Sequence, residues 1–123
     1  NPPLLLSPVL HRTTKLEIGG LVLGAFPDAE YYQGFVDLQI GDMLVCYTDG
    51  ADEAQDPTGA EMGVEGLHEL FWRFRSKAPR EFIDNLIAEL KDFTGRFPGN
   101  RSFSDDLTLM TLRRYSALKS EQL

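Results

Sequence analysis

The stretch Gly41–Ala54, GDMLVCYTDGADEA, constrains the fold of this chain more than any other. A continuous apolar run, MLVCY, ends abruptly in Thr48-Asp49-Gly50. Such a run, bounded by a turn signal, predicts a strand that is covered on both faces. We therefore expect Asp49 to leave the end of a buried strand. Gly50 then lets the chain turn, so that the carboxylate stays open to solvent.

Other apolar segments predict further strands. We expect short strands at 4–6 and within 9–18, with Ser7-Pro8 as a turn or bulge between them, and a last strand at 107–112. The segment YYQGFVDLQI, residues 31–40, is rich in aromatic and β-branched residues and also predicts a strand. Gly41-Asp42 is a tight turn of the kind that joins antiparallel neighbours. The buried side of the strand at 31–40 would be carried by Phe35, Leu38 and Ile40.

Two amphipathic helices are predicted between residues 63 and 95, after a polar loop. Pro79 is well placed at the first position of the second helix, and Gly95 is a plausible stop. The order of strands, two helices and strand predicts an α+β fold, an antiparallel sheet with both helices packed on one face. The apolar stripes have helical spacing: Val64, Leu67, Leu70, Phe71 and Phe74 in the first helix, and Phe82, Leu86, Ile87, Leu90 and Phe93 in the second.

Composition narrows the possible functions. A chain of 123 residues suits one domain, and a net charge of −7 disfavours nucleic-acid binding, which needs a basic patch. No apolar run approaches the roughly 18 residues of a membrane span. Cys46 is the only cysteine and lies inside an apolar run, which predicts a small buried hydrophobe, a reducing compartment and a cytoplasmic location.

Three carboxylates stand at the ends of predicted strands. Asp49 follows the strand at 43–47, and Asp105 and Asp106 precede the strand at 107–112. If these strands are antiparallel neighbours, all three carboxylates lie at one edge of the sheet, where they repel unless they share a proton or a cation. Carboxylate oxygens suit hard cations such as Mg²⁺ or Mn²⁺. Asp105 and Asp106 point to opposite faces, so they are not expected to share one role.

The residues alone leave a simpler interpretation open, because Asp-Gly is a common turn and Asp often caps a loop or helix. A zinc site finds less support, since His11 and His68 are far apart and lack a paired spacing. No nucleophile motif surrounds the serines at 7, 102 and 104. A phosphorylatable receiver domain is excluded because the first half lacks helices and has no acidic pair near its start.

Five motifs occur in order: NPPLLL, LEIGGLVLG, LxxGDMLVCYTDGxxEA, GAEMG and SFSDDLTLMTLR. Together they closely resemble the C-terminal part of the SpoIIE-like, or RsbU-type, serine phosphatase domain, up to about Arg114. This is the bacterial branch of the metal-dependent PPM, or type 2C, protein phosphatases. The resemblance implies an α-β-β-α sandwich with two Mn²⁺ or Mg²⁺ ions at one end of its sheets. It also implies that metal-activated water hydrolyses phosphoserine or phosphothreonine.

The resemblance assigns roles to particular residues. Asp49 and Asp105 match metal ligands of the catalytic site, and Gly50 belongs to the same metal-binding motif. Asp106 is a neighbour that hydrogen-bonds or binds a further ion, and Thr48 is expected to support the site, as is Thr108. The implied substrate is a phosphorylated protein, an anti-sigma-factor antagonist in bacterial partner-switching regulation.

The chain also departs from the family pattern. The Asp and the Gly-His-Gly motif that would bridge the two metals have no counterpart here, because in the family they precede the position of Asn1. We therefore expect residues 1–115 to be the C-terminal portion of a phosphatase domain, followed by a frayed tail at 116–123. We expect this piece to bind metal poorly and, with an apolar face uncovered, to form dimers. The alternative is a non-catalytic interaction module that keeps the phosphatase fold.

Overall fold

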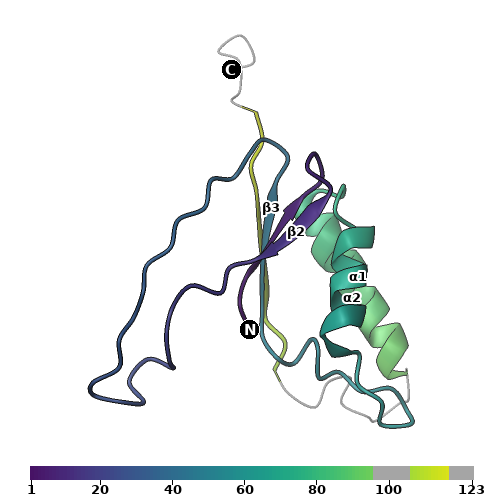
Figure 1. The fold of residues 1–123 in the computed structure, drawn as a ribbon. Coiled ribbons are helices and arrows are strands. Elements are labelled where there is room, and N and C mark those ends of the chain that lie inside the picture. Colours follow the sequence, from purple (N-terminus) through teal and green to yellow (C-terminus); the bar gives the residue numbers. More distant parts are fainter. Residues whose placement is uncertain (96–105, 117–123) are drawn as a thin grey trace.

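The computed structural model describes residues 1–95 and 106–116 (Figure 1). They form a four-stranded antiparallel sheet with two helices on one of its faces, the α+β arrangement expected from the sequence. The elements in chain order are β1 (Leu4–Ser7), β2 (Arg12–Lys15), β3 (Met43–Tyr47), α1 (Gly63–Arg73), α2 (Pro79–Thr94) and β4 (Leu109–Arg113).

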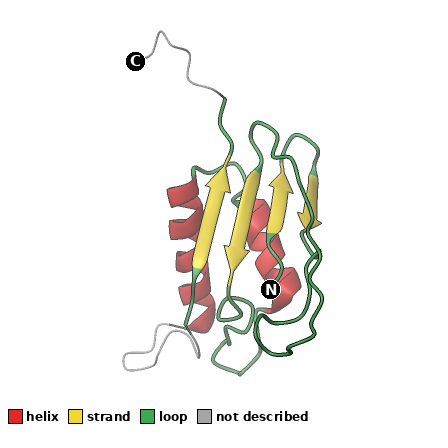
Figure 2. Cartoon of the chain, turned by 90° about the vertical axis from the view of Figure 1, so that its left-hand side faces the viewer, coloured by secondary structure: helices red, strands yellow, loops and turns green. Residues whose placement is uncertain are grey.

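The sheet has the strand order β2-β1-β3-β4, and neighbouring strands run in opposite directions (Figure 2). β1 lies in the interior, where Leu5 pairs with Thr14 of β2 and with Leu44 of β3. β3 pairs over its whole length with β4, from Met43 opposite Arg113 to Tyr47 opposite Leu109. The C-terminal end of β3 and the start of β4 therefore meet at the same edge of the sheet.

The core lies between the sheet and the helices. Alternate residues of β1 and β3 face the helices, and each large apolar side chain buried there contributes about 1.5–3 kcal/mol relative to exposure. The rings of Phe71 in α1 and Phe82 in α2 pack at a centroid distance of 5.7 Å. The predicted helical stripes are confirmed at their centres. The buried core residues from these elements are Leu4, Leu6, Met43, Val45, Tyr47, Leu67, Leu70, Phe71, Phe82, Leu86 and Leu90.

Local signals place the ends of the second helix correctly. Pro79 occupies the first turn of α2, where its missing N–H costs no hydrogen bond. Gly95 ends the helix with a positive φ of 77°, a conformation that glycine adopts without a Cβ clash. α1 starts differently, because the N–H of Gly63 donates to the carbonyl of Asp52 (2.8 Å) in the loop that follows β3.

The prediction that both faces of β3 are covered is wrong for the described residues. Met43, Val45 and Tyr47 are buried under the helices, whereas Leu44 and Cys46 on the opposite, outer face are only half-buried. On the neighbouring strand β4, Met110 is 57% exposed and Leu112 is 56% exposed. The apolar run reflects residues that could be covered on both sides, but only the helix side is covered here.

The prediction of a strand at 31–40 is also wrong in this structure. The connection between β2 and β3 contains only an isolated bridge between Gly20 and Tyr31, and it runs away from the sheet on the side opposite the helices (Figure 1). Phe35 is 91% exposed and Ile40 is 56% exposed, although both were expected to be buried. A strand forms only when a neighbour accepts and donates its hydrogen bonds, and no described segment does so here.

The second sheet of the expected sandwich remains a prediction, because the described residues form one sheet. The Gly41-Asp42 turn is present, but it joins the long connection to β3 instead of joining two strands. Most of the predicted tail, residues 117–123, lies outside the described residues. None of the described helices is long and apolar enough to cross a membrane.

Candidate functional site

Two of the three acidic residues singled out in the sequence, Asp49 and Asp106, lie at the edge of the sheet where β3 ends and β4 begins, here called the acidic edge. The pairing of these strands as antiparallel neighbours, which the sequence argument required, is present. Asp49 lies two residues beyond β3, and Asp106 lies three residues before β4. Both residues are exposed. Asp105, the other expected ligand, lies outside the described residues, as do Ser102 and Ser104.

Thr48 connects the two chain segments at this edge. Its N–H donates to the carbonyl of Thr108 (3.1 Å), which extends the β3–β4 ladder by one residue. Its side-chain oxygen accepts the N–H of Thr108 (2.9 Å), and its hydroxyl donates to the carbonyl of Asp106 (3.2 Å). The main chain beside Asp49 is therefore fixed to the main chain of Asp106 by a residue between Asp49 and the strand.

The turn that carries Asp49 is short and internally bonded. The N–H of Ala51 donates to the carbonyl of Thr48 (3.1 Å), and the N–H of Glu53 donates to the carbonyl of Asp49 (2.9 Å). Gly50 is buried but does not have a positive φ, so its role is not the left-handed turn that an Asp-Gly pair often makes. A small residue suits this position, because the next residue, Ala51, is also fully buried.

An aromatic pair lies beneath this turn on the helix side. The hydroxyl of Tyr47 and Nε2 of His68, from α1, are 3.3 Å apart, which is within hydrogen-bonding distance. Burial lowers the pKa of His68 from its ordinary 6.5, and the positive charge of Lys15 acts in the same direction, whereas Glu65 and Asp52 oppose it. Burial, followed by the negative charge of Asp52, raises the pKa of Tyr47.

The donor chemistry at the edge fits a hard divalent cation in part. Asp49 presents an exposed carboxylate that makes no hydrogen bond or ion pair within the described part of the chain. Mg²⁺ is often bound by one or two carboxylates together with water, so Asp49 and Asp106 are suitable donors. Residues 1–95 and 106–116 contain no group of three or more His, Cys, Asp or Glu side chains that could hold a metal ion. Gly50 could contribute only main-chain atoms.

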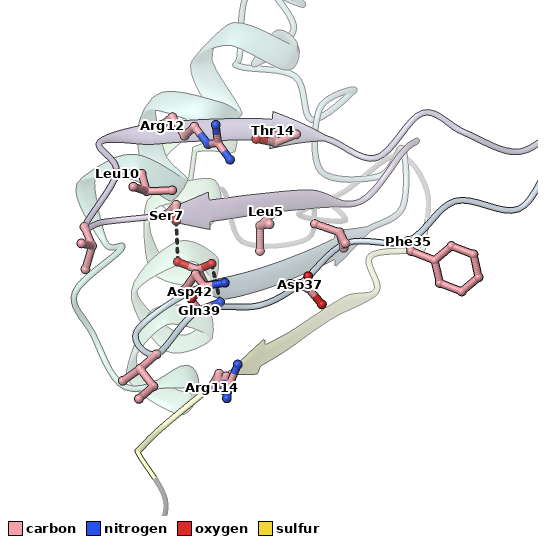
Figure 3. A pocket seen from close by; sticks show the side chains of 13 residues that line it. Leu5, Ser7, Leu10, Arg12, Thr14, Phe35, Asp37, Gln39, Asp42 and Arg114 are labelled. Carbon is pink, nitrogen blue, oxygen red and sulfur yellow. Dashed lines mark hydrogen bonds between the residues drawn. The ribbon is translucent and has the colours of Figure 1, made fainter.

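A pocket of about 790 Å³ lies at the opposite end of β3, on the outer face of the sheet (Figure 3). At its floor the carboxylate of Asp42 is 1% exposed and accepts hydrogen bonds from the hydroxyl of Ser7 and from the N–H of Gln39 (2.9 Å). Figure 3 shows Phe35 at the rim, pointing away from the other lining residues. The pocket is separated from the acidic edge by the length of the strand.

Sequence reasoning missed two of these arrangements. Asp42 was interpreted as a turn residue, but it is also a buried acceptor that joins the ends of β1 and β3. The only local signal was an acidic residue directly before an apolar strand. The sequence presented His68 only as a zinc-ligand candidate without a paired spacing. It is half-buried, and its contact with Tyr47 joins residues that are 21 positions apart. No short-range pattern encodes such a contact.

Comparisons with known proteins agree with the motifs. The family model of the stage II sporulation protein E (SpoIIE) matches residues 1–115. The phosphoserine phosphatase RsbU of Bacillus subtilis (strain 168) is 32% identical over 102 residues, which cover 80% of this chain and 28% of RsbU. The protein IcfG of Synechocystis sp. (strain PCC 6803) is 31% identical over 107 residues, which cover 86% of this chain and 16% of IcfG.

The chain thus spans less than a third of the length of either relative. No solved structure matches it significantly. The matched region, residues 1–115, contains the six helices and strands of the described residues as well as the acidic edge. The chain belongs to the SpoIIE family.

Proposed function

We propose that this chain is part of a metal-dependent protein phosphatase that hydrolyses phosphoserine or phosphothreonine in a protein substrate. Support comes from membership of the SpoIIE family and from similarity to RsbU, which is named a phosphoserine phosphatase. The observation that carries the proposal is the exposed carboxylate of Asp49, fixed by Thr48 next to the segment that contains Asp106.

The residues at the edge divide the work as follows. Asp49 and Asp105 would hold Mn²⁺ or Mg²⁺, Asp106 would support the site or bind a further ion, and the main chain at Gly50 would complete the turn. A bound divalent cation supplies Lewis acidity, which lowers the pKa of coordinated water and neutralises charge on phosphoryl oxygens. Thr48 keeps the two acidic segments at a fixed separation, so that little reorganisation is needed when the cation binds. The nucleophile is water, and no covalent intermediate forms on the protein.

The partner that fits this proposal is a phosphorylated regulatory protein, of the kind that antagonises an anti-sigma factor. This part of the proposal depends on the family alone. The edge itself is open and acidic, so a phosphoserine loop could approach it only with its charge neutralised by a cation.

Isothermal titration of Mn²⁺ into the chain, followed by hydrolysis of an aryl phosphate and of a phosphoserine peptide, tests the proposal. Asp49→Asn keeps the size of the side chain and removes its charge, so both Mn²⁺ binding and hydrolysis should fall at least tenfold. Asp84→Asn is the matched control, because Asp84 is an exposed acid on α2 far along the chain from the edge. It should leave both quantities unchanged.

The outcomes distinguish the two candidate functions. Metal-dependent hydrolysis that is lost in Asp49→Asn and retained in Asp84→Asn supports the phosphatase. Mn²⁺ binding without hydrolysis would restrict the proposal to the metal site. If Mn²⁺ binds neither this chain nor a protein extended upstream, or binds equally well in both variants, the acidic residues are not a metal site, and the non-catalytic interaction module takes its place.

A further inference from the structure

Tyr47 lies where three parts of the molecule meet: the end of β3, helix α1 and the turn that carries Asp49. Its side chain is 8% exposed and faces the helices, as its place in the alternation of β3 requires. Its ring makes edge contacts with Phe71 (centroid distance 5.4 Å) and with His68 (6.4 Å). His68 also stacks on Phe71 at 6.1 Å, so the three rings form one cluster.

The hydroxyl of Tyr47 gives this cluster a polar connection as well. It lies 3.3 Å from Nε2 of His68, and a neutral imidazole with an unprotonated Nε2 accepts the phenolic proton. The packing of the rings does not need this contact, since phenylalanine would fill the same space. The hydroxyl and the imidazole add a directional contact between the end of β3 and α1, which an apolar pair would lack.

The residues that follow Tyr47 connect it to the acidic edge. Thr48 is bonded to Thr108 and Asp106 on the β4 side, and the carbonyl of Asp52 is bonded to the N–H of Gly63 on the α1 side. Asp49 stands between these two attachments. The turn is thus held from both sides, by β4 through Thr48 and by α1 through Tyr47 and Asp52.

We propose that His68 is a positioning residue for Asp49, acting through the hydroxyl of Tyr47. The inference rests on the proposed metal site, because positioning matters only if Asp49 binds a cation. His68 does not touch the substrate or the cation. It keeps Tyr47 in one orientation, and the peptide that follows Tyr47 then directs Thr48 toward β4 and Asp49 toward solvent.

The charges around His68 agree with a neutral, accepting imidazole. Lys15 approaches from β2, Glu65 lies on α1 itself and Asp52 lies in the turn. The cation of Lys15 and the partial burial of the ring both disfavour a second proton on the imidazole, whereas the two acids favour it. Asp52 is in turn bonded by the side chain of Asn1 (2.9 Å).

The experiment compares Tyr47→Phe, which removes one oxygen atom, with His68→Leu and His68→Gln. Gln retains a side-chain acceptor, so it should restore what Leu loses. Tyr32→Phe and His11→Gln are the matched controls, because both residues are exposed and lie outside the cluster. The first readout is amide hydrogen exchange at Thr48, Ala51 and Glu53, with the amides of α2 as internal reference. The second readout is the Mn²⁺ affinity.

We expect Tyr47→Phe and His68→Leu to speed exchange at these three amides about three- to tenfold, the effect of losing one hydrogen bond. The Mn²⁺ affinity should fall by a similar factor, while His68→Gln and the two controls stay within about twofold of the parent chain. Exchange at the three amides that is unchanged, or that changes no more than in α2, would overturn the proposal. Tyr47→Phe decides the question if His68→Leu does not fold.

The two readouts also separate this inference from the proposed function. If the parent chain binds no Mn²⁺, the exchange data alone decide whether His68 positions the turn. If the parent chain binds Mn²⁺ and the variants bind it equally well, the metal site stands and the positioning role of His68 is refuted.

Discussion

Replacing Thr48 by valine measures how strongly the acidic edge is held together. Valine keeps the β-branched shape and the strand preference of threonine but lacks the hydroxyl. The substitution removes one hydrogen bond from the N–H of Thr108 (2.9 Å) and one to the carbonyl of Asp106 (3.2 Å). It leaves the main-chain bond between Thr48 and Thr108 in place. Each side-chain bond contributes about 0.5–1.5 kcal/mol net.

The position is exposed, so water can replace the lost partners, and the sum should lie in the lower part of the range. We expect the free energy of unfolding to fall by about 1–2 kcal/mol. With a urea m-value of about 2 kcal/mol/M, this shifts the midpoint by about 0.5–1 M. The fluorescence of Trp72, the only tryptophan, reports the transition because Trp72 lies in α1 and packs against the core.

Two variants serve as controls for this experiment. Thr48→Ser keeps the hydroxyl and should lose less than half as much stability as Thr48→Val. Thr13→Val makes the same change at an exposed position of β2, where the hydroxyl has no hydrogen bond to any described residue, so its effect should be close to zero. A loss below about 0.3 kcal/mol in Thr48→Val, or an equal loss in Thr48→Ser, would refute the idea that this hydroxyl ties β3 to β4.

Two further predictions concern the helix side and the outer face. The NMR signal of His68 should titrate below pH 6.5, since burial lowers its pKa. Because its folded pKa is lowered, His68 binds a proton more readily in the unfolded chain than in the folded chain. Its contribution to the free energy of unfolding is therefore complete above about pH 6.5 and is lost as the pH falls through the folded pKa. A parent chain that becomes more stable relative to His68→Gln on acidification would contradict this. The exposed apolar side chains of the connection at 16–41 and of β4 predict self-association, seen as a mass in light scattering that rises with concentration and falls in Phe35→Ser. One monomer mass at every concentration would rule it out.

The helices could be predicted from the sequence because their signals are local. Leu67, Leu70 and Phe71 repeat with the helical period, and Pro79 and Gly95 mark the limits of α2 by their own backbone preferences. Each of these signals acts within a few residues, so it holds whatever the rest of the chain does. The order of elements followed from them, and with it the α+β class.

The strand predicted at 31–40 shows where such reasoning ends. Its aromatic and β-branched residues do favour a strand, but a strand also needs a neighbouring strand as a hydrogen-bonding partner, which residue preference does not supply. Phe35 and Ile40 are exposed because nothing described lies against them. The same holds for the outer face of β3, where Leu44 and Cys46 could be fully covered and are only half-buried. An apolar pattern specifies which side can be buried, and the partner that buries it lies elsewhere in the sequence.

The acidic edge depends both on local sequence signals and on contacts between distant residues. The position of Asp49 after an apolar strand could be read locally, and so could the acids before the last strand. The contacts that hold these segments in place could not be predicted from local sequence, because Thr48 bonds to Thr108 across 60 positions and Tyr47 contacts His68 across 21. Thr48 was expected to support the site only through the family resemblance, and His68 was weighed only as a zinc ligand, so neither of these contacts could be predicted. A carboxylate becomes a useful ligand only when its main chain is fixed, and here that depends on a hydroxyl and an imidazole.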